Sequence, residues 1–185
     1  MLTSSPVGRG MRVCALPVGD IAHENSVLFL WATSPKLAEC MQVIAAWGFT
    51  YRTASVWVKD KIGMGYHFRE KHETLLVAKR GELPPPATDN RPDSVQFFPR
   101  LEHSAKPVEY YDIIDKMYPG IRKIELFQRD DQDFQPGPLW STWGNQATRN
   151  RDPASSGQDF PQTSHRQHAH AAPCLDRRPG ARAEA

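Results

Sequence analysis

An acidic residue stands near the carboxyl end of an apolar stretch in the segment RKIELFQR, which spans residues 122–129. The apolar residues on either side of Glu125 predict a short buried strand. A carboxylate at such a strand end can accept hydrogen bonds from the two hydroxyl groups of a ribose, as in dinucleotide sites. The alternative is a structural role for Glu125, on a half-exposed strand or paired with Arg122 or Lys123. The octapeptide alone leaves both interpretations open.

A second candidate is Lys106, which directly precedes Pro107 and a stretch with helical periodicity. A cation next to the positive end of a helix dipole favours a bound anion or carboxylate. An ordinary surface lysine is the alternative interpretation of Lys106.

A third group of candidates lies in a loop, the segment GYHFREKHE at residues 65–73. Its charged side chains can hold a substrate through charge-assisted hydrogen bonds, although a solvated run of charges is the usual alternative. The residues concerned are Tyr66, His67, Phe68, Arg69, Glu70, His72 and Glu73.

The segment WSTWGNQ, at residues 140–146, ends in an amide pair. Amide side chains such as Asn145 and Gln146 can read the edge of an adenine ring. The two tryptophans of the segment can stack on a ligand or fill a core, and we favour the core for them.

These residues need a scaffold, and the hydrophobic pattern predicts one. Val27–Trp31 is a continuous apolar run, typical of an interior parallel strand covered on both faces. Ser34 fits a helix N-cap and Pro35 the first helical position, and apolar residues follow at helical spacing up to Gly48, which fits the helix C-cap.

The remaining elements follow in order along the chain. Residues 51–59 and 73–81 are predicted as neighbouring strands joined by the charged loop, and residues 94–100 as a short strand. A helix opens at Pro107 and stops at Pro119 and Gly120, before the strand that carries Glu125. This order predicts an α/β fold with a mostly parallel sheet, in which ligands bind beyond the carboxyl ends of the strands.

Composition limits the folded region and the class of function. The chain has 185 residues, with 23 basic and 21 acidic side chains. Residues 147–185 are poor in apolar side chains, which predicts a disordered low-complexity tail. Three scattered cysteines without a C-x-x-C pair argue against a zinc site, and we expect no metal. No apolar run is long enough to span a membrane and no secretory signal is evident, so a cytoplasmic location is the default expectation.

Six blocks of the sequence occur in an order typical of one family. The blocks are LPVGDIA, VLFLWATSPKLAECMQVIAAWGFTYRTASVWVK, GYHFREKHETLLVAKRG, EHSAKPVEYYDII, PGIRKIELFQR and WGNQ. In this order the chain resembles the MT-A family of S-adenosylmethionine-dependent adenine-N6 methyltransferases, over roughly residues 12–146. A dehydrogenase-like nucleotide binder is disfavoured, because no G-x-G-x-x-G follows a predicted strand.

The resemblance implies a Rossmann-like methyltransferase sheet in permuted order, incomplete at its N-terminal catalytic strand. It implies three regions: a divergent leader at 1–15, a methyltransferase-like domain at 16–146 and the tail at 147–185. It also implies S-adenosylmethionine as cofactor. The cofactor-binding residues would be Lys106, Glu125, Leu126, Phe127, Arg129, Asn145 and Gln146, and the substrate side would be lined by Tyr66, Arg69 and Glu73.

The chain departs from the family in one respect, since the Asp-Pro-Pro-Trp tetrapeptide does not occur among the 185 residues. The resemblance places the strand before that tetrapeptide between Val27–Trp31 and Ile124–Phe127. We therefore expect these two strands either to close up or to leave unpaired edges. The function implied is methyl transfer to adenine in nucleic acid, with DNA favoured over RNA. The alternative is a non-catalytic binding module or a partner of another methyltransferase-like protein.

Overall fold

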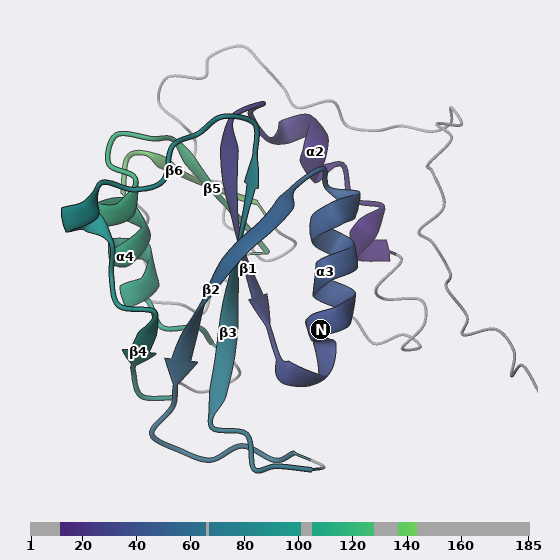
Figure 1. Ribbon diagram of the computed structural model, residues 1–185, viewed down its shortest axis with the longest axis vertical. Coiled ribbons are helices and arrows are strands. Elements are labelled where there is room, and N and C mark those ends of the chain that lie inside the picture. The colour runs from purple at the N-terminus through teal and green to yellow at the C-terminus, as the bar shows by residue number, and fades with distance from the viewer. Residues whose placement is uncertain (1–11, 66, 101–104, 128–136, 144–185) are drawn as a thin grey trace, which may run out of the picture.

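The computed structural model of the protein describes residues 12–65, 67–100, 105–127 and 137–143 (Figure 1). The predicted tail lies outside these ranges, as does most of the predicted leader. Four predicted site residues also lie outside them: Tyr66, Arg129, Asn145 and Gln146.

The described chain has the predicted alternation of strands and helices. The order strand, helix, strand, strand, short strand, helix, strand is confirmed, while α2 and β6 were not predicted. In sequence order the elements are α2 (Val18–Ile21), β1 (Ser26–Ala32), η1 (Ser34–Lys36), α3 (Leu37–Ala46), β2 (Thr50–Val58), β3 (His72–Arg80), η2 (Thr88–Asn90), β4 (Val95–Phe97), α4 (Glu109–Met117), β5 (Lys123–Leu126) and β6 (Trp140–Trp143).

The main sheet has the strand order β1-β3-β2-β4 and is mixed. β3 pairs antiparallel with both β1 and β2, and only β2 and β4 pair in parallel. The prediction of a mostly parallel sheet was therefore wrong. A return through the loop before β3, without a crossover helix, places β3 antiparallel to the strand it follows.

β1 is covered on both faces as predicted, but it is neither interior nor parallel in the described sheet. Its single strand partner there is β3, along all seven residues. Leu28 and Leu30 pack towards one core, while Phe29 and Trp31 pack towards the other. A continuous apolar run indicates that both faces of a strand are buried. Burial of both faces does not decide whether the strand runs parallel or antiparallel to its neighbour.

β5 and β6 form a second, two-stranded parallel sheet. β5 does not close onto β1 by hydrogen bonding, because the two strands belong to different sheets in the described chain. Side-chain packing still joins them, since Leu126 of β5 packs against the same core cluster as Leu28 and Leu30 of β1. The Rossmann-like α/β class is confirmed, but the strands form two sheets, with β1 in one and β5 in the other.

The two long helices cover opposite faces of the main sheet (Figure 1). Val43 and Ile44 of α3 pack with Leu76 and Ala78 of β3. On the other face, Tyr110 of α4 packs with Trp57 and Leu75.

The ends of α3 differ in how well the sequence predicted them. Ser34 is not its N-cap: a 3-10 turn spans Ser34–Lys36, and the helix then begins at Leu37 without a side-chain cap. Gly48 ends the helix as predicted, with φ of 79°. The N–H of Gly48 donates to Ala45 and that of Phe49 to Ile44, which is a Schellman motif. In the described part of the chain no helix is long and apolar enough to cross a membrane.

Candidate active site

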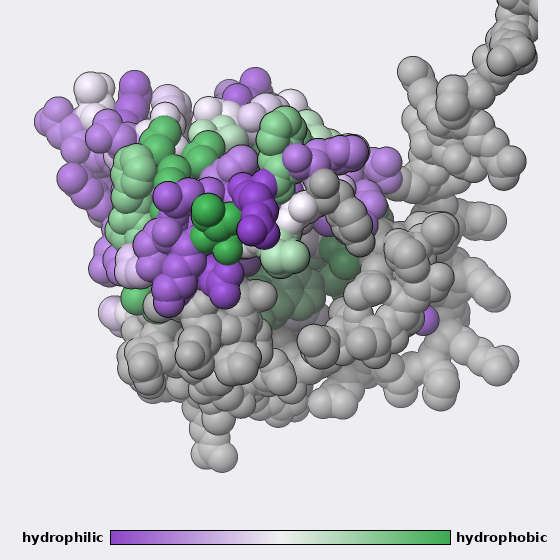
Figure 2. All heavy atoms as spheres, turned by 90° about the horizontal axis from the view of Figure 1, so that it is seen from below, coloured by the Kyte–Doolittle hydropathy of each residue, from purple (hydrophilic) through white to green (hydrophobic). Residues whose placement is uncertain are grey.

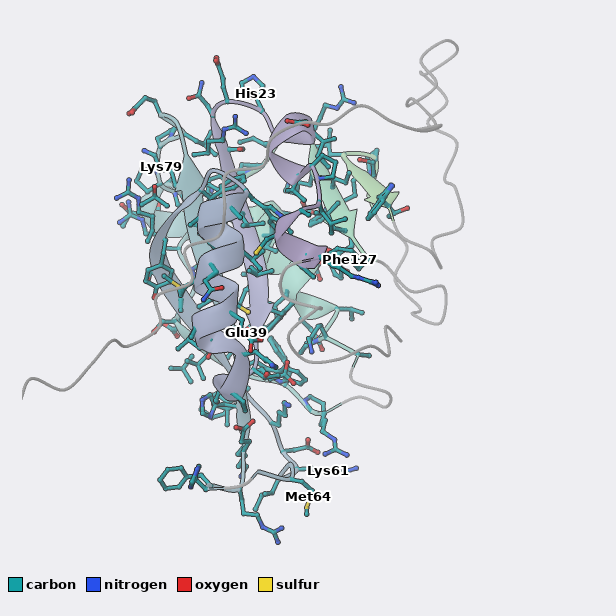
Figure 3. The ribbon with its side chains drawn as sticks, turned by 90° about the vertical axis from the view of Figure 1, so that its right-hand side faces the viewer. His23, Glu39, Lys61, Met64, Lys79 and Phe127 are labelled. Carbon is teal, nitrogen blue, oxygen red and sulfur yellow. The ribbon has the colours of Figure 1, made fainter. Side chains whose placement is uncertain are left out.

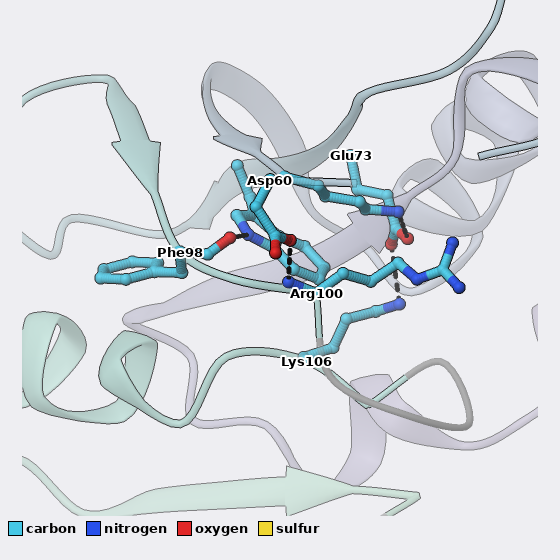
Figure 4. Close-up of polar contacts among 7 residues, drawn as sticks. Asp60, Glu73, Phe98, Arg100 and Lys106 are labelled. Atoms are coloured by element: carbon cyan, nitrogen blue, oxygen red, sulfur yellow. Dashed lines mark hydrogen bonds and ion pairs between the residues drawn. The ribbon is translucent and has the colours of Figure 1, made fainter. Parts of the chain in front are cut away.

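A carboxylate held between two lysines is the central feature of the candidate site (Figure 4). Glu73 Oε1 lies 2.6 Å from Lys59 Nζ, and Glu73 Oε2 lies 2.7 Å from Lys106 Nζ. Among the described residues, the cluster comprises these two lysines and one carboxylate. Lys106 is the more accessible lysine, with its side chain 30% exposed against 12% for Lys59.

The strand order explains why Glu73 and Lys59 meet. Because β3 runs antiparallel to β1 and β2, its first residues lie beside the carboxyl ends of those strands. Glu73 is registered with Trp57, two residues before Lys59, and Trp31 near the end of β1 is registered with Leu75. The site therefore lies at the sheet edge where ligands of open α/β sheets bind.

Glu73 is buried, with 8% of its surface exposed, so a solvated charge run does not describe it. Burial alone would raise its pKa, but the hydrogen bonds and charges of Lys106 and Lys59 outweigh burial and hold the pKa below its ordinary value. Glu73 is thus an ionised hydrogen-bond acceptor and is poorly suited to taking up a proton at neutral pH.

Aromatic rings form the wall behind the ion cluster. Lys59 Nζ lies 4.9 Å from the ring centroid of Trp57, and Lys106 Nζ lies 5.8 Å from that of Trp31. The two indoles meet edge to face at 6.0 Å. Such rings attract cations and exclude water, which strengthens the charges beside them.

The segment after β4 is fixed against the same strand end (Figure 4). Trp57 Nε1 donates to the carbonyl of Phe98 at 2.8 Å, and the N–H of Arg100 donates to Asp60 Oδ1 at 2.7 Å. The Arg100 hydrogen bond lowers the pKa of Asp60. These bonds place the chain beyond β2 and β4 beside the cluster, ahead of Lys106.

Lys106 precedes α4 as predicted, followed by the fully buried Pro107. The helix itself begins at Glu109. The alternative of an ordinary surface lysine is wrong, because Lys106 contacts both Glu73 and the ring of Trp31.

Glu125 belongs to a second cluster, between α4 and the β5–β6 sheet. Among the described residues, the Tyr111 hydroxyl on α4 is the group that opposes the effect of burial on the Glu125 carboxyl, while Lys123 pairs with Asp115 instead. Burial raises the pKa of Glu125 to about 7, against the opposing hydrogen bond from Tyr111. Burial also raises the pKa of Tyr111, as does the neighbouring Glu125 charge, so Tyr111 is a neutral donor at physiological pH.

Lys123 closes the base of this second cluster. Its Nζ donates to the carbonyls of Tyr118 and Ile121, each at 2.9 Å, and lies 2.8 Å from Asp115 Oδ1. Asp115 in turn accepts from Trp140 Nε1 at 3.0 Å. The end of α4 and the starts of β5 and β6 are thereby joined through one cation.

The two residues after Glu125 have different environments. Leu126 packs against the core beside α3. Phe127 is 49% exposed, with φ of 70°, and meets Trp143 edge to face at 5.8 Å (Figure 3). Trp143 is itself 51% exposed, so it is not the core anchor that we favoured from sequence. Trp140 is half-buried against Tyr111.

A cleft of about 770 Å³ opens between the β1–α3 turn and the β2–β3 loop. Arg69, His72, Lys71 and His67 give it a mainly basic lining, with Glu70 as the acidic member. Phe68 of the lining is 84% exposed. Lys61 and Met64 are at the projecting tip of this loop (Figure 3). Figure 2 shows hydrophobic side chains among hydrophilic ones at this end of the domain, and Ile62, Met64 and Phe68 of the loop are exposed.

The structure thus brings Lys106 and Glu73, both site candidates from the sequence, into direct contact, which the sequence did not predict. Glu125 lies in the second cluster, and α4 connects the two clusters because Lys106 precedes it and Tyr111 lies in it. Sequence reasoning missed Lys59 and Tyr111. The available signal for Lys59 was its place as the last residue of the predicted strand 51–59, whereas Tyr111 lay in the predicted helix after Pro107 with no further signal.

Comparisons with known proteins give the family of the chain. The profile of the MT-A70 family matches residues 9–146. The chain belongs to the MT-A70 family. Type II methyltransferase M.MunI of Mycoplasma sp is 34% identical over 137 residues, which cover 74% of this chain and 57% of that protein.

Animal members of the MT-A70 family are also similar to the chain. The N(6)-adenosine-methyltransferase catalytic subunit METTL3 of Homo sapiens is 31% identical over 145 residues, covering 74% of this chain and 24% of that protein. The MT-A70-like protein of Drosophila melanogaster is 31% identical over 147 residues, covering 74% and 22%. The chain therefore spans just over half the length of the bacterial relative and about a quarter of the animal ones.

Proposed function

We propose that this domain binds S-adenosylmethionine and presents its methyl group to the exocyclic amine of an adenine in nucleic acid. The observation that carries the proposal is the ion pair between Lys106 and Glu73. The family resemblance implies that Lys106 lies on the cofactor side and Glu73 on the adenine side, and the two meet at the carboxyl-end edge of the sheet, where ligands of open α/β sheets bind.

The described residues fit the two ends of the cofactor. Lys106, the more accessible lysine of the cluster, suits the carboxylate of the methionine part. Glu125 is a half-buried carboxyl group that suits the two ribose hydroxyls. Since Lys59 stays on Glu73, Lys106 can turn to a ligand without leaving Glu73 unpaired.

The cofactor, when bound, supplies an electrophilic methyl group: the adenine nitrogen forms the new N–C bond, the S–C bond breaks, S-adenosylhomocysteine leaves and a proton of the amine passes to solvent. Glu73 serves as an acceptor that orients the amine. Trp31 and Trp57 exclude water behind it. Arg69 and the basic cleft hold the nucleic-acid backbone by charge.

We favour DNA over RNA as the substrate. The support is the greater similarity to the bacterial relative, at 34% identity over 57% of its length, than to the N(6)-adenosine methyltransferase of Homo sapiens, at 31% over 24%. Parallel assays on the two nucleic acids with matched sequences test this preference.

Calorimetric titration with S-adenosylmethionine, together with tritium transfer from it to adenine-containing oligonucleotides, tests the proposal. Lys106→Met is expected to weaken cofactor binding at least about tenfold, as expected for loss of a charge-assisted hydrogen bond. Lys36→Met is the matched control, because Lys36 forms an ion pair of similar length with Glu39 on the surface. A folded wild-type chain without measurable cofactor binding would contradict the proposal.

The alternative function is a non-catalytic binding subunit. The observation that favours it is that the chain contains no Asp-Pro-Pro-Trp tetrapeptide. Cofactor or nucleic-acid binding without tritium transfer to DNA or RNA supports this alternative for the 185-residue chain. Transfer that appears only after addition of a second methyltransferase-like protein would identify a partner subunit.

A further inference from the structure

Large apolar side chains project into solvent from the loop between β2 and β3. Ile62, Met64 and Phe68 are 57%, 87% and 84% exposed. Single exposed apolar residues are ordinary on a protein surface, whereas several gathered in one short loop mark a surface that contacts another molecule. The proposed function uses the charges of this loop and leaves its apolar side chains unexplained.

The base of the loop is a hairpin that continues the β2–β3 ladder. The N–H of Lys59 donates to the carbonyl of Lys71 at 2.8 Å, and the N–H of Gly63 donates to the carbonyl of Glu70 at 2.7 Å. These bonds hold the two arms of the hairpin together beyond the ends of the strands. The exposed side chains are therefore carried on a backbone that is already ordered without a ligand.

Two local contacts fix the tip of the hairpin, where Met64 projects from the domain (Figure 3). Arg69 Nη1 donates to Met64 Sδ at 3.6 Å. Gly65 permits the tight turn, because an added Cβ would overlap the carbonyl oxygen of Phe68. The tip is thus pre-organised, which lowers the entropic cost of inserting its side chains into a partner.

Cations surround the exposed apolar side chains. Phe68 lines the cleft of about 770 Å³ together with Arg69, Lys71 and His72. A nucleic acid is complementary to such a surface, because its bases offer flat apolar faces and its phosphates are anions. An apolar protein surface would leave the same cations without a counter-charge. Charge and shape together favour a nucleic acid as the partner of the hairpin.

We propose that Phe68 is a base-stacking wedge, whose ring inserts beside the target adenine and fills the space that this base leaves when it swings towards Glu73. The proposal rests on the proposed function, which places the adenine at Glu73. It goes further by assigning the extrusion of the base to a residue of the β2–β3 hairpin.

An adenine stacked within a duplex does not reach Glu73, which is buried beside the rings of Trp31 and Trp57. Proteins that act on a base take it out of the stack at a cost in free energy, and an apolar side chain inserted between bases offsets part of that cost. Only residues 69–72 separate Phe68 from Glu73, which limits their separation to about 17 Å along an extended strand. The wedge and the extruded base therefore lie on one bound nucleic acid.

The first test is fluorescence anisotropy of the full chain with a labelled, adenine-containing DNA duplex over a range of salt concentrations. Phe68→Ala should weaken binding roughly tenfold, as expected for the loss of one stacked base, with an unchanged dependence of affinity on salt. Phe68→Tyr keeps the ring and should bind as wild type does. Lys71→Met should instead reduce the salt slope by about one. Wild-type affinity in F68A would overturn the proposal.

Phe97→Ala is the matched control for loss of an exposed phenylalanine. Phe97 is 73% exposed, but it lies on β4 and is not among the described residues that line the cleft. F97A should bind the duplex as wild type does. Equal losses in F97A and F68A would overturn the assignment of the wedge to Phe68.

A second readout reports extrusion itself. In duplexes with 2-aminopurine in place of adenine, fluorescence rises when that base leaves the stack. Wild type should raise the fluorescence at saturating protein, and F68A should raise it less. Equal rises for the two proteins would overturn the role of Phe68. Self-association of wild type that F68A abolishes, measured by sedimentation without nucleic acid, would also overturn it and assign the surface to a contact between copies.

Calorimetry with S-adenosylmethionine keeps the wedge and the proposed function separate. F68A should bind the cofactor as wild type does, because Phe68 lies on the cleft side, away from Lys106. Wild type that binds the cofactor, with DNA affinities equal in wild type and F68A, overturns the wedge alone. Wild type that binds neither cofactor nor DNA contradicts the proposed function and, with it, the wedge.

Discussion

Glu73 and Lys106 form an ion pair of 2.7 Å between the start of β3 and the segment before α4. Lys59, at the end of β2, occupies the other oxygen of the same carboxylate. The three residues come from separate parts of the chain, so the cluster forms only when the sheet and the α4 face are both assembled. Its stability and its chemistry depend on the same contacts.

Glu73→Gln is expected to destabilise the protein. The substitution leaves Lys59 and Lys106 facing each other without a counter-charge in a largely buried position, at a cost of about 2–4 kcal/mol. Denaturant unfolding at pH 7 measures the loss. Glu39→Gln, which breaks the exposed pair with Lys36, should cost less than about 1 kcal/mol. Equal losses for the two variants would contradict the importance of burial.

The same carboxylate predicts a pH dependence at the acid end. Because the folded state lowers the pKa of Glu73, this residue contributes stability above its ordinary pKa of 4.5. That contribution is lost as the pH falls through the lowered folded pKa. Wild type should therefore lose more stability than Glu73→Gln when unfolding is compared at pH 6 and at pH 3.

Glu125 predicts the opposite slope at higher pH. Its pKa is raised from 4.5 to about 7, so the folded state binds a proton more tightly than the unfolded state does. The free energy of unfolding should therefore fall as the pH rises from about 4.5 to about 7. Thermal unfolding across this interval should show a shallower decrease for Glu125→Gln. A steeper decrease would contradict the assignment.

Lys123→Met tests the connection between α4, β5 and β6. Lys123 donates to two backbone carbonyls and pairs with Asp115, and its side chain is only 9% exposed. Removal of the ammonium group leaves these acceptors unpaired, at a cost of about 2–4 kcal/mol. Lys116→Met is the control on the exposed side of α4 and should change stability by less than about 0.5 kcal/mol. Chemical denaturation of the two variants gives the comparison.

Gly48 and Gly81 both have positive φ, but substitution by alanine is expected to reduce the free energy of unfolding by different amounts at the two positions. Gly48 has φ of 79° and open space around an added Cβ, so Gly48→Ala should cost only about 1–2 kcal/mol for the left-handed backbone. Gly81 has φ of 64°, and an added Cβ would lie 2.3 Å from the Glu24 carbonyl oxygen. Gly81→Ala should therefore destabilise more. Melting temperatures of the two variants in one buffer decide the order.

The sequence by itself determined the element order, the end of α3 and the residue types of the candidate site. These features depend on local chemistry. The apolar run of β1 must be buried on both faces, and the turn after α3 needs a positive φ, which glycine adopts readily at Gly48. Pro107 marks the segment that leads into α4. The family followed from the order of the six blocks, and the profile match over residues 9–146 confirms it.

Only the tertiary structure decided which residues meet. The antiparallel placement of β3 brings Glu73 to Lys59, and it cannot be read from the apolar pattern because both strand directions bury the same side chains. The contact between the rings of Tyr111 and Trp140 depends on how α4 docks on the β5–β6 sheet. Trp143 of the same sheet is 51% exposed, which the sequence pattern did not indicate. Hydrophobic periodicity indicates which faces of a helix or strand are buried. Which side chains contact each other depends on how segments distant in the chain pack together.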